Sequence, residues 1–311
     1  MNEITHIKLG TRTSPLALAQ ANMVKNSLER HHDNIRVEII LINTSGDIQQ
    51  DKRLADIGGK GLFTKELDIA LIDGRCDIAV HSLKDVETNL PEGTILGCFL
   101  PREDVRDVFI SSEGIKLMNM PQGATIGTSS LRRQAQILKM RPDFNVILFR
   151  GNVATRLQKL QSGVADGTML ALAGLKRLRK NSVATEILDT DTFIPAVGQG
   201  AITVQCREKD TYIIDILQPL NCTKTKTEVC CERNMLEALD GTCKTPVGAY
   251  AFIEGDTIKI DAFASTDDGV HFEHIVQSDM VKNADILGKT VGKELRRRMG
   301  TDFDTMGIMH E

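Results

Sequence analysis

The segment ITHIKLGTRTSPLALAQ, residues 4–20, contains the pattern that decides the fold class. Ile4–Leu9 has the composition of a strand, and Ser14 followed by Pro15 is typical of a helix start, with serine as the N-cap and proline at the first helical position. Apolar residues then recur at helical spacing, at Leu16, Ala19, Met23 and Val24. A strand followed closely by a helix is the unit from which parallel α/β sheets are built.

The same alternation continues along the chain. Val37–Ile42 is a continuous apolar run, which predicts a strand buried on both faces. Further strands are expected at Asp77–Val80, Thr125–Ile126, Val146–Phe149 and Thr168–Ala171, and helices at Thr64–Ile72, from Ser129 or Ser130 to Met140, and near Thr155–Ser162. We therefore expect two α/β lobes with doubly wound sheets.

Two segments, Pro101–Asp104 and Ala196–Gly200, bracket the second block and resemble crossings between lobes. Ile202–Cys206 is then expected to return as a strand to the first sheet. After Pro219 the pattern changes to a helix, three strands and a final helix, expected at Thr227–Leu239, Val247–Ile253, Thr257–Ser265, Val270–Val276 and Ala284–Met299. The sequence thus predicts a first lobe from residues 1–100 and 201–218, a second from 101–200, and a C-terminal α+β domain from 219–311.

Composition argues against several classes of protein. The 311 residues carry a formal net charge of −4, whereas a protein that coats nucleic acid needs a broad basic face. No apolar stretch approaches the roughly 20 residues of a membrane span, and the first residues lack the pattern of a secretory signal. Seven irregularly spaced cysteines without a CxxC pair indicate a reducing cytoplasm and no metal site.

Arginine and lysine nevertheless gather in short turns beside glycine, serine and threonine. The clearest of these turns are His81–Asp85, Gly127–Arg133 and Arg150–Arg156. Guanidinium groups bind carboxylates bidentately, and hydroxyl and turn N–H groups add further donors. Several of these cations follow predicted strands or begin a predicted helix, where α/β folds bind ligands. The pattern predicts a pocket for a small ligand with several negative charges.

Asp85 and Cys243 are candidates for chemistry. Asp85, among cations, stays ionised and could stabilise a developing cation or move a proton, but its spacing fits a salt-bridged turn residue equally well. Lys84 fits a charge partner better than a Schiff-base lysine. Cys243 adjoins Lys244, whose charge lowers a thiol pKa, although a free cysteine is more often a small buried hydrophobe. The residues alone leave both roles open.

Taken together, these segments resemble the porphobilinogen deaminase family, also called hydroxymethylbilane synthases. The resemblance runs from Thr11–Leu18 to the cysteine loop Gly241–Pro246, and the remainder of the chain is compatible with it. The segments that follow the family's order in between are Gly58–Phe63, His81–Asp85, Gly127–Arg133, Arg150–Arg156, Ala173–Arg177 and Pro195–Ala201. Six segments in register with a cysteine loop make the resemblance highly specific.

The resemblance implies two periplasmic-binding-protein-like (type II) lobes that face each other across a cleft, and a third domain that carries a covalent dipyrromethane cofactor. It implies condensation of four porphobilinogen molecules head to tail with loss of ammonia, followed by hydrolysis to hydroxymethylbilane. Cys243 is the implied thioether attachment site and Asp85 the implied catalytic carboxylate. The implied cofactor- and substrate-binding residues are Arg12, Ser14, Gln20, Lys60, Phe63, Ser82, Lys84, Thr128, Ser129, Ser130, Arg132, Arg133, Arg150, Gly151, Asn152, Arg156, Arg177 and Gln199.

The chain departs from the family pattern at a few positions. Asp56 stands where many relatives have lysine, which reverses a charge and puts that ligand contact in doubt. Val105 replaces a common proline and Ala154 a common glycine. The remaining alternatives are a two-lobed protein that binds a small polycarboxylate without turnover and a sulfhydryl enzyme that acts on another polycarboxylate. We expect a monomer whose partners are porphobilinogen and the growing oligopyrrole.

Overall fold

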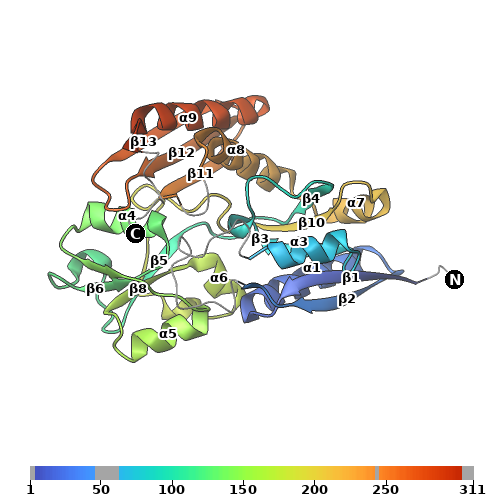
Figure 1. Cartoon of the computed structure of the whole chain (residues 1–311), viewed down its shortest axis with the longest axis horizontal. Helices are drawn as coiled ribbons and strands as arrows, with labels where there is room; N and C mark the ends of the chain where they lie inside the picture. The colour runs from blue at the N-terminus through green and yellow to red at the C-terminus, as the bar shows by residue number, and fades with distance from the viewer. Residues whose placement is uncertain (1–3, 46–62, 242–244, 303–311) are drawn as a thin grey trace. The chain divides into compact units, whose positions relative to one another are not determined.

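A computed structural model describes residues 4–45, 63–241 and 245–302 (Figure 1). Contacts divide these residues into two compact units: 4–45, 63–103 and 201–226 form the first, and 104–200, 227–241 and 245–302 form the second. The division into three domains with the bounds given above stays a prediction. In the described part of the chain, no helix has the length and apolar character needed to cross a membrane.

The first unit is built on a five-stranded sheet with the order β2-β1-β3-β10-β4. Its strands are β1 Thr5–Arg12, β2 Ile35–Ile42, β3 Ile78–Ser82, β4 Thr94–Phe99 and β10 Ile202–Arg207. β1 pairs parallel with β2 and β3, whereas β10 lies antiparallel between β3 and β4. The strand predicted at Ile202–Cys206 therefore does return to the first sheet, with its direction reversed.

Helices cover both faces of this sheet. α1 Pro15–His31 and α7 Thr211–Leu217 pack against one buried cluster, and α3 Lys65–Ile72 packs against another. As predicted, Ser14 caps α1: its Oγ accepts a hydrogen bond from the Ala17 N–H at 3.3 Å. The buried face of α1 differs from the predicted one, since it consists of Ala17, Gln20, Ala21, Val24 and Leu28, whereas Met23 is 46% exposed.

The second unit contains a sheet of the same design, with the order β7-β6-β8-β5-β9. Its strands are β5 Asp107–Ser111, β6 Thr125–Gly127, β7 Asn145–Ile147, β8 Gly167–Ala171 and β9 Glu186–Ile187. β6 pairs parallel with β7 and β8, and β5 runs antiparallel between β8 and β9. The helices associated with this sheet are α4 Leu131–Met140, α5 Val153–Gln161 and α6 Leu172–Arg177.

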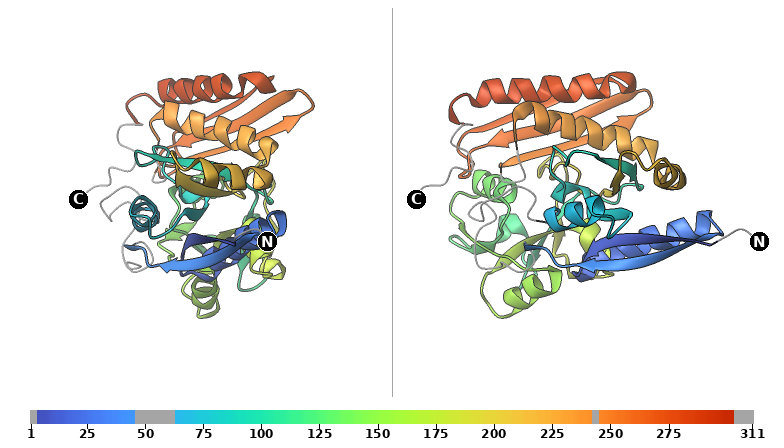
Figure 2. Two further views of the ribbon diagram at one scale, coloured as in Figure 1. Left: turned by 90° about the vertical axis from the view of Figure 1, so that its right-hand side faces the viewer. Right: turned by 45° about the vertical axis from the view of Figure 1, so that its right-hand side comes forward.

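The C-terminal part of the second unit is a three-stranded antiparallel sheet with two helices on one face (Figure 2). It comprises α8 Thr223–Leu239 from Thr227 onward, β11 Val247–Glu254, β12 Thr257–Ser265, β13 Phe272–Met280 and α9 Ala284–Met299. The two helices approach closely at Gly288, where a Cβ atom would lie 2.2 Å from the carbonyl oxygen of Cys231. The predicted fold class, two doubly wound α/β lobes with a smaller α+β domain, is confirmed.

Candidate functional site

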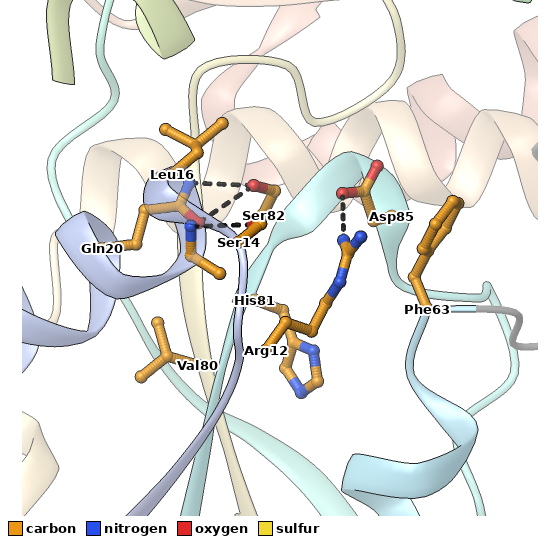
Figure 3. A pocket seen from close by; sticks show the side chains of 10 residues that line it. Arg12, Ser14, Leu16, Gln20, Phe63, Val80, His81, Ser82 and Asp85 are labelled. Carbon is orange, nitrogen blue, oxygen red and sulfur yellow. Dashed lines mark hydrogen bonds and ion pairs between the residues drawn. The ribbon is translucent and has the colours of Figure 1, made fainter. Parts of the chain in front are cut away.

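One group of the predicted site residues lies at the carboxyl ends of two neighbouring parallel strands, β1 and β3, in the first unit. Arg12 is the last residue of β1, and the short 3-10 helix η1 Leu83–Asp85 follows β3 directly. Parallel strands end at the same edge of a sheet, so the two segments deliver their polar side chains to one pocket. The pocket is lined by Arg12, Ser14, Leu16, Ala17, Gln20, Phe63, Val80, His81, Ser82 and Asp85 (Figure 3).

Arg12 and Asp85 point toward each other across this pocket (Figure 3). Arg12 Nη1 lies 3.8 Å from Asp85 Oδ2, and the guanidinium carbon lies 4.4 Å from the centre of the Phe63 ring. The Asp85 side chain is 33% exposed, so its carboxylate can also accept a hydrogen bond from a ligand. The loose ion pair and the aromatic ring hold the cation without saturating the carboxylate.

Three of the predicted polar ligands form the opposite wall of the pocket. Gln20 Nε2 donates a hydrogen bond to Ser82 Oγ at 2.8 Å, which links α1 to the end of β3. Ser14 uses its hydroxyl to cap α1, as described above. Lys84 lies in η1 one residue before Asp85 and is half-buried.

His81 is a pocket residue to which the sequence assigned no role. Its ring is buried, and Nε2 lies 2.9 Å from Gln205 Oε1. Burial is the main cause that lowers the pKa of His81 to about 4; the charge of Arg12 acts in the same direction, and the hydrogen bond from Gln205 opposes them. The imidazole is therefore neutral near pH 7 and adds no charge to the pocket.

A second group of predicted ligands lies in the second unit. Arg132 and Arg133 lie in the first turn of α4, both side chains are more than nine-tenths buried, and both bind the carboxylate of Asp107 at 2.6 Å. Burial acts to raise the pKa of Asp107, but the charges and hydrogen bonds of the two arginines outweigh it and hold the pKa well below its ordinary value. Asp107, like His81, was missed by the sequence analysis.

The N-termini of α4 and α5 lie in the same unit as these arginines. Ser130 caps α4 through the Arg133 N–H, and Asn152 caps α5 through the Thr155 N–H. Free N–H groups and the helix dipole make such termini favourable for anions. Gly151, at φ 124°, occupies a backbone conformation that other residues rarely adopt.

The remaining predicted ligands of this unit differ in burial. Arg150 is buried, and burial lowers its pKa, whereas Arg156 is half-buried and donates from Nε to the Gly151 carbonyl at 2.9 Å. Arg177 Nη2 binds the Gly200 carbonyl, and Gln199 Nε2 binds Asp107 and the Val105 carbonyl. Thr128 is buried and accepts a hydrogen bond from the Ser130 N–H, and Ser129 is half-buried.

Lys60, Cys243 and the charge-reversing Asp56 lie outside the described residues. Within residues 4–45, 63–241 and 245–302, the histidine, cysteine, aspartate and glutamate side chains form no group of three that could hold a metal ion.

Two family models match the chain: "Porphobilinogen deaminase, dipyromethane cofactor binding domain" over residues 7–215, and "Porphobilinogen deaminase, C-terminal domain" over residues 226–297. The chain is 49% identical over 300 residues to a porphobilinogen deaminase of Nitrobacter winogradskyi, covering 96% of this chain and 95% of the relative. It is 48% identical over 310 residues to a chloroplastic porphobilinogen deaminase of Oryza sativa subsp. japonica, covering 97% of this chain and 86% of the relative.

Among solved structures, the methionine binding protein MetQ aligns with a TM-score of 0.45 at 12% identity, covering 71% of this chain and 92% of that one. The periplasmic VFT2 domain of Bordetella pertussis BvgS aligns with a TM-score of 0.40 at 14% identity, covering 68% of this chain and 85% of that domain's chain.

Proposed function

This chain belongs to the porphobilinogen deaminase family, and from that premise we propose which of its residues carry out the reaction. The family's members are hydroxymethylbilane synthases, transferases of tetrapyrrole biosynthesis that act on porphobilinogen and contain a dipyrromethane cofactor. Membership in an enzyme family decides against the alternative of a binding protein without turnover, and against a sulfhydryl enzyme for another polycarboxylate.

The residues present fit a cofactor whose outer atoms are carboxylates. Arg132, Arg133 and Asp107 together carry one more positive than negative charge in a buried place, and the Nε of Arg132 is buried without a hydrogen-bond partner. A buried donor without a partner is costly, so a carboxylate that accepts from it would stabilise the site. When bound, the cofactor supplies the primer to which the first substrate molecule is joined.

We assign the catalytic role to Asp85. Loss of ammonia leaves a cationic pyrrole derivative, and the partly exposed carboxylate of Asp85 is available to stabilise that cation and to accept pyrrole N–H groups. Arg12 lies close enough to help hold Asp85 in place, and its own guanidinium group can bind a substrate carboxylate. The observation that supports this assignment most directly is the convergence of Arg12 and Asp85 at the ends of β1 and β3.

The remaining predicted ligands are assigned to the acetate and propionate groups of the cofactor and the growing chain. In the first unit these are Arg12, Ser14, Gln20, Phe63, Ser82 and Lys84, with Lys60 assigned from the sequence alone. In the second unit they are Thr128, Ser129, Ser130, Arg132, Arg133, Arg150, Gly151, Asn152, Arg156, Arg177 and Gln199. Each porphobilinogen brings two carboxylates, so an oligopyrrole needs many such cationic and hydroxyl partners.

Asp85→Asn tests the catalytic assignment, because it removes the negative charge while preserving the shape of the side chain. Turnover of porphobilinogen should fall on the order of 10²–10³-fold, the usual effect of losing one preorganised electrostatic partner. The variant should still gain the cofactor mass when hydroxymethylbilane is supplied. Asp73→Asn, at an exposed aspartate of the same unit, is the matched control and should turn over normally. Near-normal turnover by Asp85→Asn would rule out the assignment.

We also propose that the protein works as a monomer in the cytoplasm, without a nucleic-acid or membrane partner. The six cysteines in the described part of the chain form no disulfide bond, which is usual in a reducing compartment. Sedimentation equilibrium should give the mass of one chain, and a mass of two chains would contradict the monomer.

A further inference from the structure

Asp107 is the first residue of β5, and its side chain is fully buried. Its Oδ2 accepts a hydrogen bond from Arg132 Nη2 at 2.6 Å. Its Oδ1 accepts from Arg133 Nη2 at 2.6 Å, from Arg133 Nε at 3.2 Å and from Gln199 Nε2 at 3.1 Å. A carboxylate with so many donors is held in one orientation.

Arg132 and Arg133 need such a partner because their surroundings oppose two positive charges. They are neighbours in sequence, both are buried, and both lie in the first turn of α4, where the helix dipole disfavours cations. In the described part of the chain, the ion pairs of both arginines are with Asp107. Asp107 therefore keeps two like charges side by side while leaving one positive charge uncompensated.

Asp107 also determines which donors of the two arginines remain for a ligand. Besides Asp107, Arg132 binds the carbonyl of Ile194 and Arg133 binds the carbonyl of Met169. Each guanidinium has five N–H groups, so within the described residues about half of the ten are engaged. Because a guanidinium group is planar, the N–H groups bound to Asp107 fix the orientation of the whole group. The remaining N–H groups, including the buried Nε–H of Arg132, therefore point in directions set by the Asp107 carboxylate.

We propose that Asp107 is a positioning residue, which aligns the free N–H groups of Arg132 and Arg133 for the carboxylates of the cofactor and of the growing chain. This inference rests on the proposed function, because it takes the two arginines as ligands of those carboxylates. Asp107 does not touch the ligand in this account, since its oxygens are occupied by Arg132, Arg133 and Gln199. Its effect depends on where its carboxylate lies as well as on its charge.

Two substitutions separate the position of this carboxylate from its charge. Asp107→Asn removes the charge, whereas Asp107→Glu keeps the charge and moves the carboxylate by one methylene group. The rate at which the full-length apoprotein gains the cofactor mass is measured by intact mass spectrometry after addition of hydroxymethylbilane, under conditions where urea titration shows each variant to be folded. Both variants should load about 10²-fold more slowly than the wild type, the usual effect of a displacement near 1 Å.

Asp104 offers matched controls in the same unit. It is partly buried and pairs with Arg106 and Lys176. Asp104→Asn and Asp104→Glu should lose some stability and load at the wild-type rate. If Asp107→Asn does not fold, Asp107→Glu decides the question alone.

A folded Asp107→Glu variant that loads at the wild-type rate would overturn the inference, because it would show that the residue only balances charge. Equal slowing of the Asp104 and Asp107 variants would overturn it as well, since the effect would then follow general destabilisation. A wild-type chain that never gains the cofactor mass would instead contradict the proposed function, and this inference with it.

Discussion

Asp85 and Asp107 both face arginine, but their burial gives them different roles. Asp107 is fully buried and hydrogen-bonded on both oxygens, so it has little capacity to meet a ligand. Asp85 is one-third exposed, with its arginine at 3.8 Å, so its carboxylate is held near a cation and is still accessible. The same pair of residue types thus gives an internal counter-ion in one unit and a candidate catalytic group in the other.

The buried His81 predicts a specific dependence of stability on pH. Its pKa is about 4 in the folded chain and 6.5 as the ordinary value, so between these pH values the unfolded chain binds a proton that the folded chain does not. The free energy of unfolding should therefore be largest above pH 6.5 and should fall as the pH decreases toward 4. The loss due to His81 should approach about 3 kcal/mol.

Urea titrations of the wild type and of His81→Gln at a series of pH values measure this contribution. Glutamine does not titrate, and the carboxylates are common to both proteins, so the difference between the two curves isolates the histidine. The wild-type curve should fall more steeply between pH 6.5 and 4. Parallel curves over that range would contradict the burial of a neutral His81.

At the scale of elements, helix caps hold several predicted ligands in place. The sequence predicted a cap at Ser14 and another at Ser129 or Ser130, and the structure shows the caps at Ser14 and Ser130. Asn152 was expected to bind ligand, and the structure shows that it also caps α5, with its Oδ1 accepting from the Thr155 N–H at 3.0 Å. Arg156 lies one turn into the same helix, so the cap also helps to fix that arginine.

Asn152→Ala should lower the free energy of unfolding by about 1 kcal/mol, the usual cost of removing an N-cap. Asn152→Ser is the matched control, because serine is an equally good cap and should restore most of the loss. Urea titration of the three proteins measures the effect. Equal stability of the alanine and serine variants would show that the cap contributes nothing.

Local patterns were sufficient to predict most helices and strands, because capping, periodicity and apolar runs act over a few residues. The strands β4 and β5 were not predicted, and the antiparallel directions of β5 and β10 followed from no local signal. The direction of a strand depends on which end of the sheet the chain reaches after a connection from a distant part of the sequence. The buried face of α1 was also displaced from the predicted one, since several faces of this alanine- and leucine-rich helix are apolar.

The candidate site could be predicted where residues match the family's motifs, but their partners could not. His81 pairs with Gln205, which is 124 positions away along the chain, and Asp107 binds arginines 25 and 26 positions away. Pairings over such distances are decided by the sheet topology, which the motifs do not contain. For that reason the sequence identified candidate ligands and missed the residues that hold them.

For the whole molecule, a net charge of −4 coexists with cationic groups in both units. Their number exceeds what one dicarboxylate substrate can engage, so we expect the oligopyrrole to grow while it stays bound to the protein. With porphobilinogen limiting, intact mass spectrometry should show a ladder of discrete covalent species, each heavier by one pyrrole unit. Native electrophoresis should resolve them as progressively faster bands, because each unit adds about two negative charges.

Arg156→Ala and Arg150→Ala should each stall this ladder at particular steps. A desolvated carboxylate left without its partner costs several kcal/mol, so the missing arginine matters only when a given ring's carboxylates arrive. Arg141→Ala is the control, since Arg141 pairs with Asp143 and is assigned no ligand role. Uniform slowing of every step would show instead that these arginines act on substrate entry or on folding.

The central claim is that this chain builds a tetrapyrrole on a dipyrromethane held by Cys243, and the intact mass of the purified protein tests it most directly. The wild-type chain should exceed its sequence mass by two pyrrole units, and Cys243→Ser should have the sequence mass alone and no turnover. Alanine at Cys222, Cys230 or Cys231 should leave the added mass in place. A wild-type chain at its bare sequence mass, or a Cys243→Ser variant that still carries the adduct, would contradict the claim.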